Sequence, residues 1–108
     1  MTSFKELFEA QKKPEVGDYV LWEMATTDGI YQVIGEIVDK RKIKNRWHYD
    51  VKRKYIINFY DKPVSSGVKK GLGEIEYDMK PSLFQQIFTP SSLNEYLNNI
   101  DKKFIISK

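Results

Sequence analysis

The fold is decided by residues 30–54, which read IYQVIGEIVDKRKIKNRWHYDVKRK. Apolar and polar residues alternate over residues 30–40, and apolar side chains fall on both faces of that stretch. This period of two is typical of a β-strand, and Gly35 in the middle is where a long strand can bend sharply. The segment therefore predicts one long, strongly bent strand of a small β-barrel.

The second half of this stretch predicts a partner strand. Residues 46–54 alternate cleanly in polarity. One face carries Trp47, Tyr49 and Val51, and the other carries His48, Asp50 and Lys52. The basic residues 41–45 separate the two strands and predict the turn of a hairpin. We therefore expect two antiparallel strands joined by a strongly basic turn.

Shorter patterns predict further strands. Runs of β-branched and aromatic residues bounded by turn residues are typical of strands. The predicted strands are 19–23, 55–60, 74–79 and a short last strand at 104–106. Residues 65–73 are rich in glycine and have no periodicity, so they predict a mobile loop.

Helix signals occur near both ends of the chain. Ser3 and Glu6 are spaced as a capping box, which predicts a helix at residues 4–12. Pro81 predicts the start of a helical turn that carries apolar residues up to Phe88 and is interrupted by Pro90. Ser92 and Glu95 form a second capping-box spacing, which predicts another short helix.

Together these elements predict an α+β, mostly β fold: a small, strongly bent antiparallel β-barrel with a short N-terminal helix and one or two short C-terminal helices. A chain of 108 residues predicts one domain. It divides into a helical segment at 1–14, the barrel at 16–80 and a helical segment with the possible last strand at 81–108. The predicted core contains Val20, Trp22, Val33, Ile37, Val51 and Ile57.

Composition excludes several kinds of chemistry. Cysteine is absent, which excludes disulfides, a thiol nucleophile and every cysteine-based metal site. His48 is the only histidine, and no convincing metal cluster or nucleophile accompanies it, so we expect no enzyme activity and no cofactor.

The sequence contains no apolar run long enough to predict a membrane span or a signal peptide, so we expect a cytoplasmic protein. Lysine outnumbers arginine 15 to 3, as AT-rich codons of a low-GC bacterium or its phage would produce.

Residues 16–22 read VGDYVLW and residues 28–38 read DGIYQVIGEIV. This arrangement resembles the first two strands of Tudor-like and KOW-like small barrels of the Src-homology-3-like class. The resemblance implies that Trp22 and Tyr31 are candidate walls of an aromatic cage. A later strand lacks the aromatic-x-x-aromatic-Gly pattern that completes such cages in that class.

Charge is concentrated in the predicted hairpin. Residues 40–54 carry eight cations and one acid, so the segment has a charge of +7 within a chain of +3. The candidate binding residues for nucleic acid or another partner are Lys40, Arg41, Lys42, Lys44, Arg46, Trp47, Lys52, Arg53 and Lys54. Cations attract phosphates and flat rings stack on unpaired bases, so we expect nucleic-acid binding. In the alternative interpretation the aromatic rings face the core and the lysines form a solvated turn.

Two other functions are compatible with the same residues. A basic patch also fits an acidic protein surface, as in a protein-interaction module or a phage-type inhibitor that docks on a host protein. A remote alternative is a magnesium-dependent nuclease that uses Asp39, Asp50 and Lys52, because paired carboxylates hold the metal while a lysine orients the attacking water. The sequence leaves the partner and the oligomeric state open.

Overall fold

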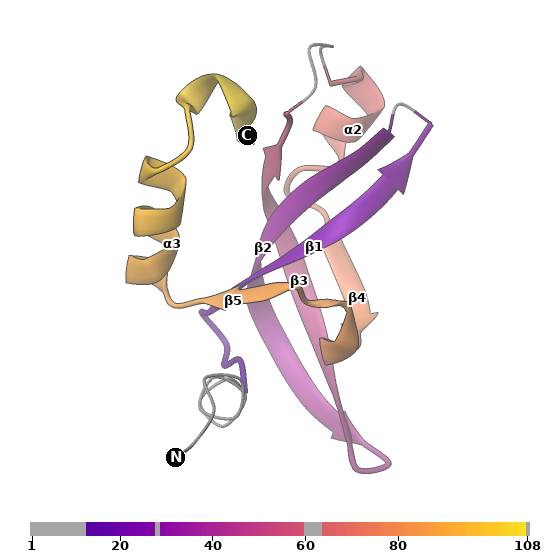
Figure 1. The fold of residues 1–108 in the computed structure, drawn as a ribbon. Coiled ribbons are helices and arrows are strands. Elements are labelled where there is room, and N and C mark those ends of the chain that lie inside the picture. Colours follow the sequence, from indigo (N-terminus) through magenta and orange to yellow (C-terminus); the bar gives the residue numbers. More distant parts are fainter. Residues whose placement is uncertain (1–12, 28, 60–63, 108) are drawn as a thin grey trace.

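The computed structural model describes residues 13–27, 29–59 and 64–107 (Figure 1). Six antiparallel strands form one sheet: β1 (Tyr19–Thr26), β2 (Gly29–Ile43), β3 (Arg46–Ile57), β4 (Ile75–Met79), β5 (Gln86–Phe88) and β6 (Ile105–Ser107). The strand order is β4-β3-β2-β1-β5, and β6 also pairs with β3. The mostly β, antiparallel fold with short helices is confirmed. Among the described residues β4 and β5 do not pair, so the sheet is open and a closed barrel is not confirmed.

The β2–β3 hairpin has a tighter turn than the sequence predicts. Lys44 and Asn45 alone form the turn, with φ angles of 50° and 64°. Two successive left-handed residues match the twist of the flanking strands, and asparagine adopts this conformation readily. Arg41 and Lys42, predicted within the turn, therefore lie in β2 opposite His48 and Trp47.

The bend of β2 has two causes. The pairing of β2 with β3 shifts between Ile34 and Gly35 and again between Ile37 and Asp39. Such bulges increase the local twist and bend of a sheet. In addition, a Cβ at Gly35 would lie 2.5 Å from Cγ1 of Val51, so the strands approach too closely there for any side chain. Glycine at this position therefore permits the close contact between β2 and β3.

All six residues predicted for the core are buried. One cluster lies around Trp22 and Val51 and contains Val20, Val33, Ile37, Tyr49 and Met79. A second contains Leu21, Ile34, Ile57 and Phe88 and is covered by Leu93 and its neighbours from α3 (Pro90–Asn98). A third joins Tyr31 and Ile56 to Val64 and Leu72, which flank α2 (Ser66–Lys70).

Residues 65–73 are partly helical, so their prediction as a loop is wrong. The Ser65 side chain accepts a hydrogen bond from the Val68 backbone N–H and caps α2. Val68 packs against the third core cluster, and Leu72 belongs to it. Burial of these two apolar residues outweighs the low helix propensity of Gly67. The loop prediction rested on glycine content and took no account of this burial.

Residues 81–88 also differ from the helical prediction. Only residues Pro81–Leu83 form a 3-10 turn, and the chain then pairs with β1 as β5. Ile87 packs on the first core cluster and Phe88 belongs to the second, so consecutive side chains lie on opposite faces of the sheet. Backbone pairing with the free edge of β1 therefore makes residues 86–88 a strand and not part of a helix.

The remaining predictions differ from the structure in detail. β3 runs without a break from the strand predicted at 46–54 into the one predicted at 55–60, and ends at Ile57. β6 forms one residue beyond the strand predicted at 104–106. The capping box of α3 consists of Thr89 and Ser92, not Ser92 and Glu95, because Pro90 occupies the first helical position. The helix predicted at residues 4–12 lies outside the described residues. A 3-10 turn at Lys102–Phe104 precedes β6.

Candidate nucleic-acid interface

Four of the eight cations of residues 40–54 form ion pairs with acidic residues in the described part of the chain. Their acidic partners come largely from outside that segment. The pairs are Lys40–Glu15, Arg53–Glu76, Lys54–Glu36 at 3.6 Å, and Arg41 with Asp39, Asp50 and Asp78. Acidic residues distant in sequence therefore neutralise about half of the positive charge of the segment.

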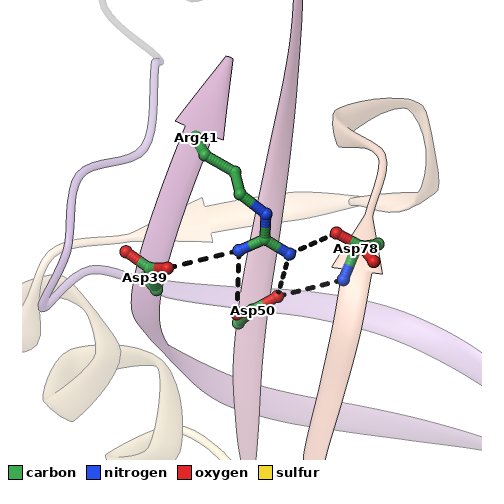
Figure 2. A network of polar contacts seen from close by, with 4 residues as sticks. All are labelled: Asp39, Arg41, Asp50 and Asp78. Atoms are coloured by element: carbon green, nitrogen blue, oxygen red, sulfur yellow. Dashed lines mark hydrogen bonds and ion pairs between the residues drawn. The ribbon is translucent and has the colours of Figure 1, made fainter. Parts of the chain in front are cut away.

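Arg41 is the most strongly bound of these cations (Figure 2). Its Nη1 and Nη2 atoms donate to the two carboxylate oxygens of Asp50, each at 2.9 Å. Nη1 also donates to Asp39 at 3.2 Å, and Nη2 pairs with Asp78. The network joins β2, β3 and β4 through one guanidinium. Arg41 therefore holds the sheet together and is not free to bind a phosphate.

Asp50 lies at the centre of this network. It is only 7% exposed, and its Oδ1 atom also accepts a hydrogen bond from the Asp78 backbone N–H at 3.0 Å. Asp78 has a φ of 58°, in the irregular part of the β3–β4 pairing. The Arg41 guanidinium lowers the pKa of Asp50, and the hydrogen bond from Asp78 adds to this effect, while burial opposes it. Hydrogen bonds from Arg41 to the carboxylates of Asp50 and Asp78 raise the pKa of Arg41. Asp50 is thus an ionised structural carboxylate.

The nuclease alternative does not fit this geometry. Asp39 and Asp50 face each other across β2 and β3, but both oxygens of Asp50 bind Arg41. A guanidinium therefore occupies the position between the carboxylates that a magnesium ion would need. Lys52 lies opposite Glu36 in the backbone register of β2 and β3, away from that position. No group of three or more acidic or histidine side chains within residues 13–27, 29–59 and 64–107 is arranged to hold a metal.

The aromatic residues of the hairpin are largely occupied by the protein itself. Tyr49 is 2% exposed and makes an edge contact with Phe84, with ring centroids 5.5 Å apart. Trp47 is half-buried and packs against the first core cluster. The Nζ atoms of Lys40 and Lys42 lie 4.8 Å and 5.9 Å from its ring centroid. The alternative interpretation, in which the rings face the core, therefore describes Tyr49 fully and Trp47 in part.

Trp22 and Tyr31 do not form an open cage. Trp22 is 6% exposed and Tyr31 is 1% exposed. The two rings also belong to different core clusters. Both aromatic residues contribute to stability here, and neither presents a ring face to a ligand.

Within residues 40–54, the cations that lack an acidic partner in the described part of the chain are Lys42, Lys44, Arg46 and Lys52. Three of them surround the β2–β3 turn and are exposed. Lys52 lies farther along β3. It belongs to an open groove of about 520 Å³ that is lined by Lys52, Arg53, Lys54, Tyr55, Gly73 and Ser107. The structure thus divides the predicted basic segment into two parts. The tip, residues 42–46, carries the free cations Lys42, Lys44 and Arg46. In the remaining part, the stem, most cations are paired.

We call residues 40–49 the basic ribbon. Beyond Ile37 the outer edge of β2 has no backbone partner among the described residues, and β4 joins β3 only from Tyr49 onward. The hairpin therefore continues as two strands alone and projects from the sheet at the end opposite α2 (Figure 1). This exposes both faces of its tip.

Comparison of the chain with protein-family models, curated proteins and solved structures found no match in any of the three. The resemblance of residues 16–38 to Tudor-like and KOW-like barrels therefore stays a prediction. In the described part of the chain no helix is long and apolar enough to span a membrane.

Proposed function

We propose that this protein binds nucleic acid through the tip of the basic ribbon. The observation that carries the proposal is that Lys42, Lys44 and Arg46 have no acidic partner among the described residues. Three neighbouring cations without internal counter-charges create a local positive field, which attracts phosphates at long range. We also propose that the protein has no enzyme activity, needs no cofactor and lies in the cytoplasm. In this proposal its fold is related to Tudor-like barrels.

The paired stem supports this assignment by positioning the tip. Arg41 binds Asp50 and Asp78, and so connects the ribbon to β4. Trp47 packs against the first core cluster, and the Nζ atom of Lys40 lies 4.8 Å from the centroid of its ring. A rigid support reduces the loss of conformational entropy that accompanies binding.

The test is fluorescence anisotropy with labelled single-stranded and duplex oligonucleotides over a range of salt concentrations. The variant is Lys42→Gln/Lys44→Gln, and the matched control is Lys69→Gln/Lys70→Gln, which removes equal charge from α2 at the other end of the sheet. We expect the tip variant to flatten the slope of log affinity against log salt by about 1.8 for a duplex or about 1.4 for a single strand, and the control to change it by less than about 0.3. Absence of binding at low salt, or equal losses in both variants, would contradict the proposal.

A second candidate function is docking on an acidic protein, as an interaction module or a phage-type inhibitor. The outer edge of β2 beyond Ile37 favours it, because that edge has no backbone partner among the described residues and an extended segment of a partner protein can add to such an edge. A protein partner of this kind would leave both oligonucleotides unbound in the anisotropy experiment.

A further inference from the structure

We infer that the nucleic acid is duplex DNA and that the tip of the basic ribbon enters its major groove. This inference rests on the proposed function and adds the class of nucleic acid. Three independent features of the ribbon lead to it: the state of its aromatic rings, the distribution of its free cations and its thickness.

The aromatic rings argue against a single strand. Proteins that bind single strands stack successive bases on exposed rings. Tyr49 is buried, and Trp47 is covered by Lys40 and Lys42 on a ring that already packs against the core. Neither Tyr49 nor Trp47 therefore offers a fully free ring face to a base.

The exposed rings elsewhere do not replace them. Tyr77 is 67% exposed on β4, and Phe59 is 56% exposed just beyond the other end of β3. Tyr77 lies beside residues 49–51 of β3 in the register, whereas Phe59 follows the last residue of that strand, so the two rings do not form a series on which neighbouring bases would stack. Of these two exposed rings, Tyr77 is the one nearer to the ribbon in the register, which makes it a useful probe.

The free cations are distributed over both faces of the ribbon. In the backbone register of β2 and β3, Lys42 lies opposite Trp47, and Ile43 lies opposite Arg46. Because consecutive residues of a strand point to opposite faces, Lys42 and Arg46 lie on different faces, with Lys44 in the turn between them. A single strand presents one line of phosphates to one face. A duplex groove has a phosphate backbone on each wall, which matches cations on both faces.

The dimensions select the groove. The ribbon consists of two strands about 4.8 Å apart with side chains on both faces. Such a ribbon fits the major groove of B-form DNA, which is about 12 Å wide, and not the minor groove, which is about 6 Å wide. Residues 41–43 extend the ribbon by about 10 Å at the rise of a β-strand, comparable with a groove depth of about 8.5 Å. Duplex RNA has a deep and narrow major groove that excludes such an element.

The experiment compares duplex DNA, single-stranded DNA and duplex RNA of equal length by anisotropy with the full chain at about 50 mM salt. We expect duplex DNA to bind at least about tenfold more tightly than the other two, and Tyr77→Ala to change its dissociation constant by less than about twofold. A polyamide that fills the minor groove should leave duplex binding within about twofold of its value without the polyamide.

The outcomes separate the inference from the proposed function. Equal or tighter binding of single-stranded DNA, particularly if Tyr77→Ala abolishes it, overturns the duplex inference and retains nucleic-acid binding. Equal binding of duplex RNA, or displacement by the polyamide, overturns the assignment to the major groove of DNA. No binding to any of the three probes rejects the proposed function itself.

Discussion

Arg41 and Asp50 form a two-point ion pair across the β2–β3 hairpin, with both N–O distances at 2.9 Å. The pair lies where the hairpin leaves the sheet, and Asp78 from β4 binds both partners. A planar guanidinium and a carboxylate match each other in two parallel hydrogen bonds, which fixes orientation as well as distance. This contact therefore sets the direction in which the basic ribbon projects.

The first prediction concerns this pair. Arg41→Gln should lower the midpoint of thermal unfolding by about 5–10 °C, because it leaves the buried carboxylate of Asp50 without its cation. The control is Asp39→Asn, which removes only an exposed contact and should change the midpoint by less than about 2 °C. The double variant Arg41→Gln/Asp50→Asn should be more stable than Arg41→Gln, and a double variant that is less stable would contradict this account.

The second prediction is a pH dependence. The folded-state pKa of Asp50 is lowered, so its contribution to stability is present above the unfolded-state value of 3.8 and is lost as the pH falls through the folded-state pKa. Urea unfolding at pH 7 and pH 3 measures the difference. Asp50→Asn should show a smaller loss between these pH values than the wild type. Equal losses would mean that other carboxylates account for the acid sensitivity.

The third prediction tests the close approach at Gly35. A Cβ there would lie 2.8 Å from the Lys52 carbonyl oxygen and 3.0 Å from Cη2 of Trp22, so Gly35→Ala should destabilise the fold by about 1–3 kcal/mol. Gly67→Ala is the control, because a Cβ there meets nothing within 4 Å and alanine favours α2. Chemical denaturation should show opposite signs for the two substitutions.

The fourth prediction separates stability from binding in the hairpin turn. Lys44→Asn/Asn45→Gly places the residues most suited to two left-handed positions at the turn. It should raise the free energy of unfolding by about 1 kcal/mol and flatten the salt dependence of DNA binding by about 0.9. A more stable variant with unchanged salt dependence would show that Lys44 does not contact phosphate.

The fifth prediction compares two arginines of β3. Arg46 has no acidic partner in the described part of the chain, whereas Arg53 pairs with Glu76. Arg46→Gln should flatten the salt slope by about 0.9, and Arg53→Gln should change it by less than about 0.3. Both substitutions remove the same charge, so equal slopes would indicate a response to net charge alone.

Local sequence determined much of the sheet. The alternation of residues 30–40 and 46–54 identified both strands of the hairpin, and the residues predicted for the core are buried. These predictions succeed because side chains of a strand point to alternate faces, so a half-buried strand repeats every two residues. The cluster of cations near residue 44 was equally visible, because it needs no partner to be recognised.

Contacts between distant parts of the chain decided the rest. Asp78 reaches Arg41 from 37 residues away, Glu76 reaches Arg53 from 23, and Glu15 reaches Lys40 from 25. The conversion of residues 86–88 into a strand likewise depends on the free edge of β1. Sequence alone determined where positive charge and apolar surface occur. Only the tertiary structure determined which charges remain free, because an ion pair depends on distance in space, which the spacing along the chain does not specify.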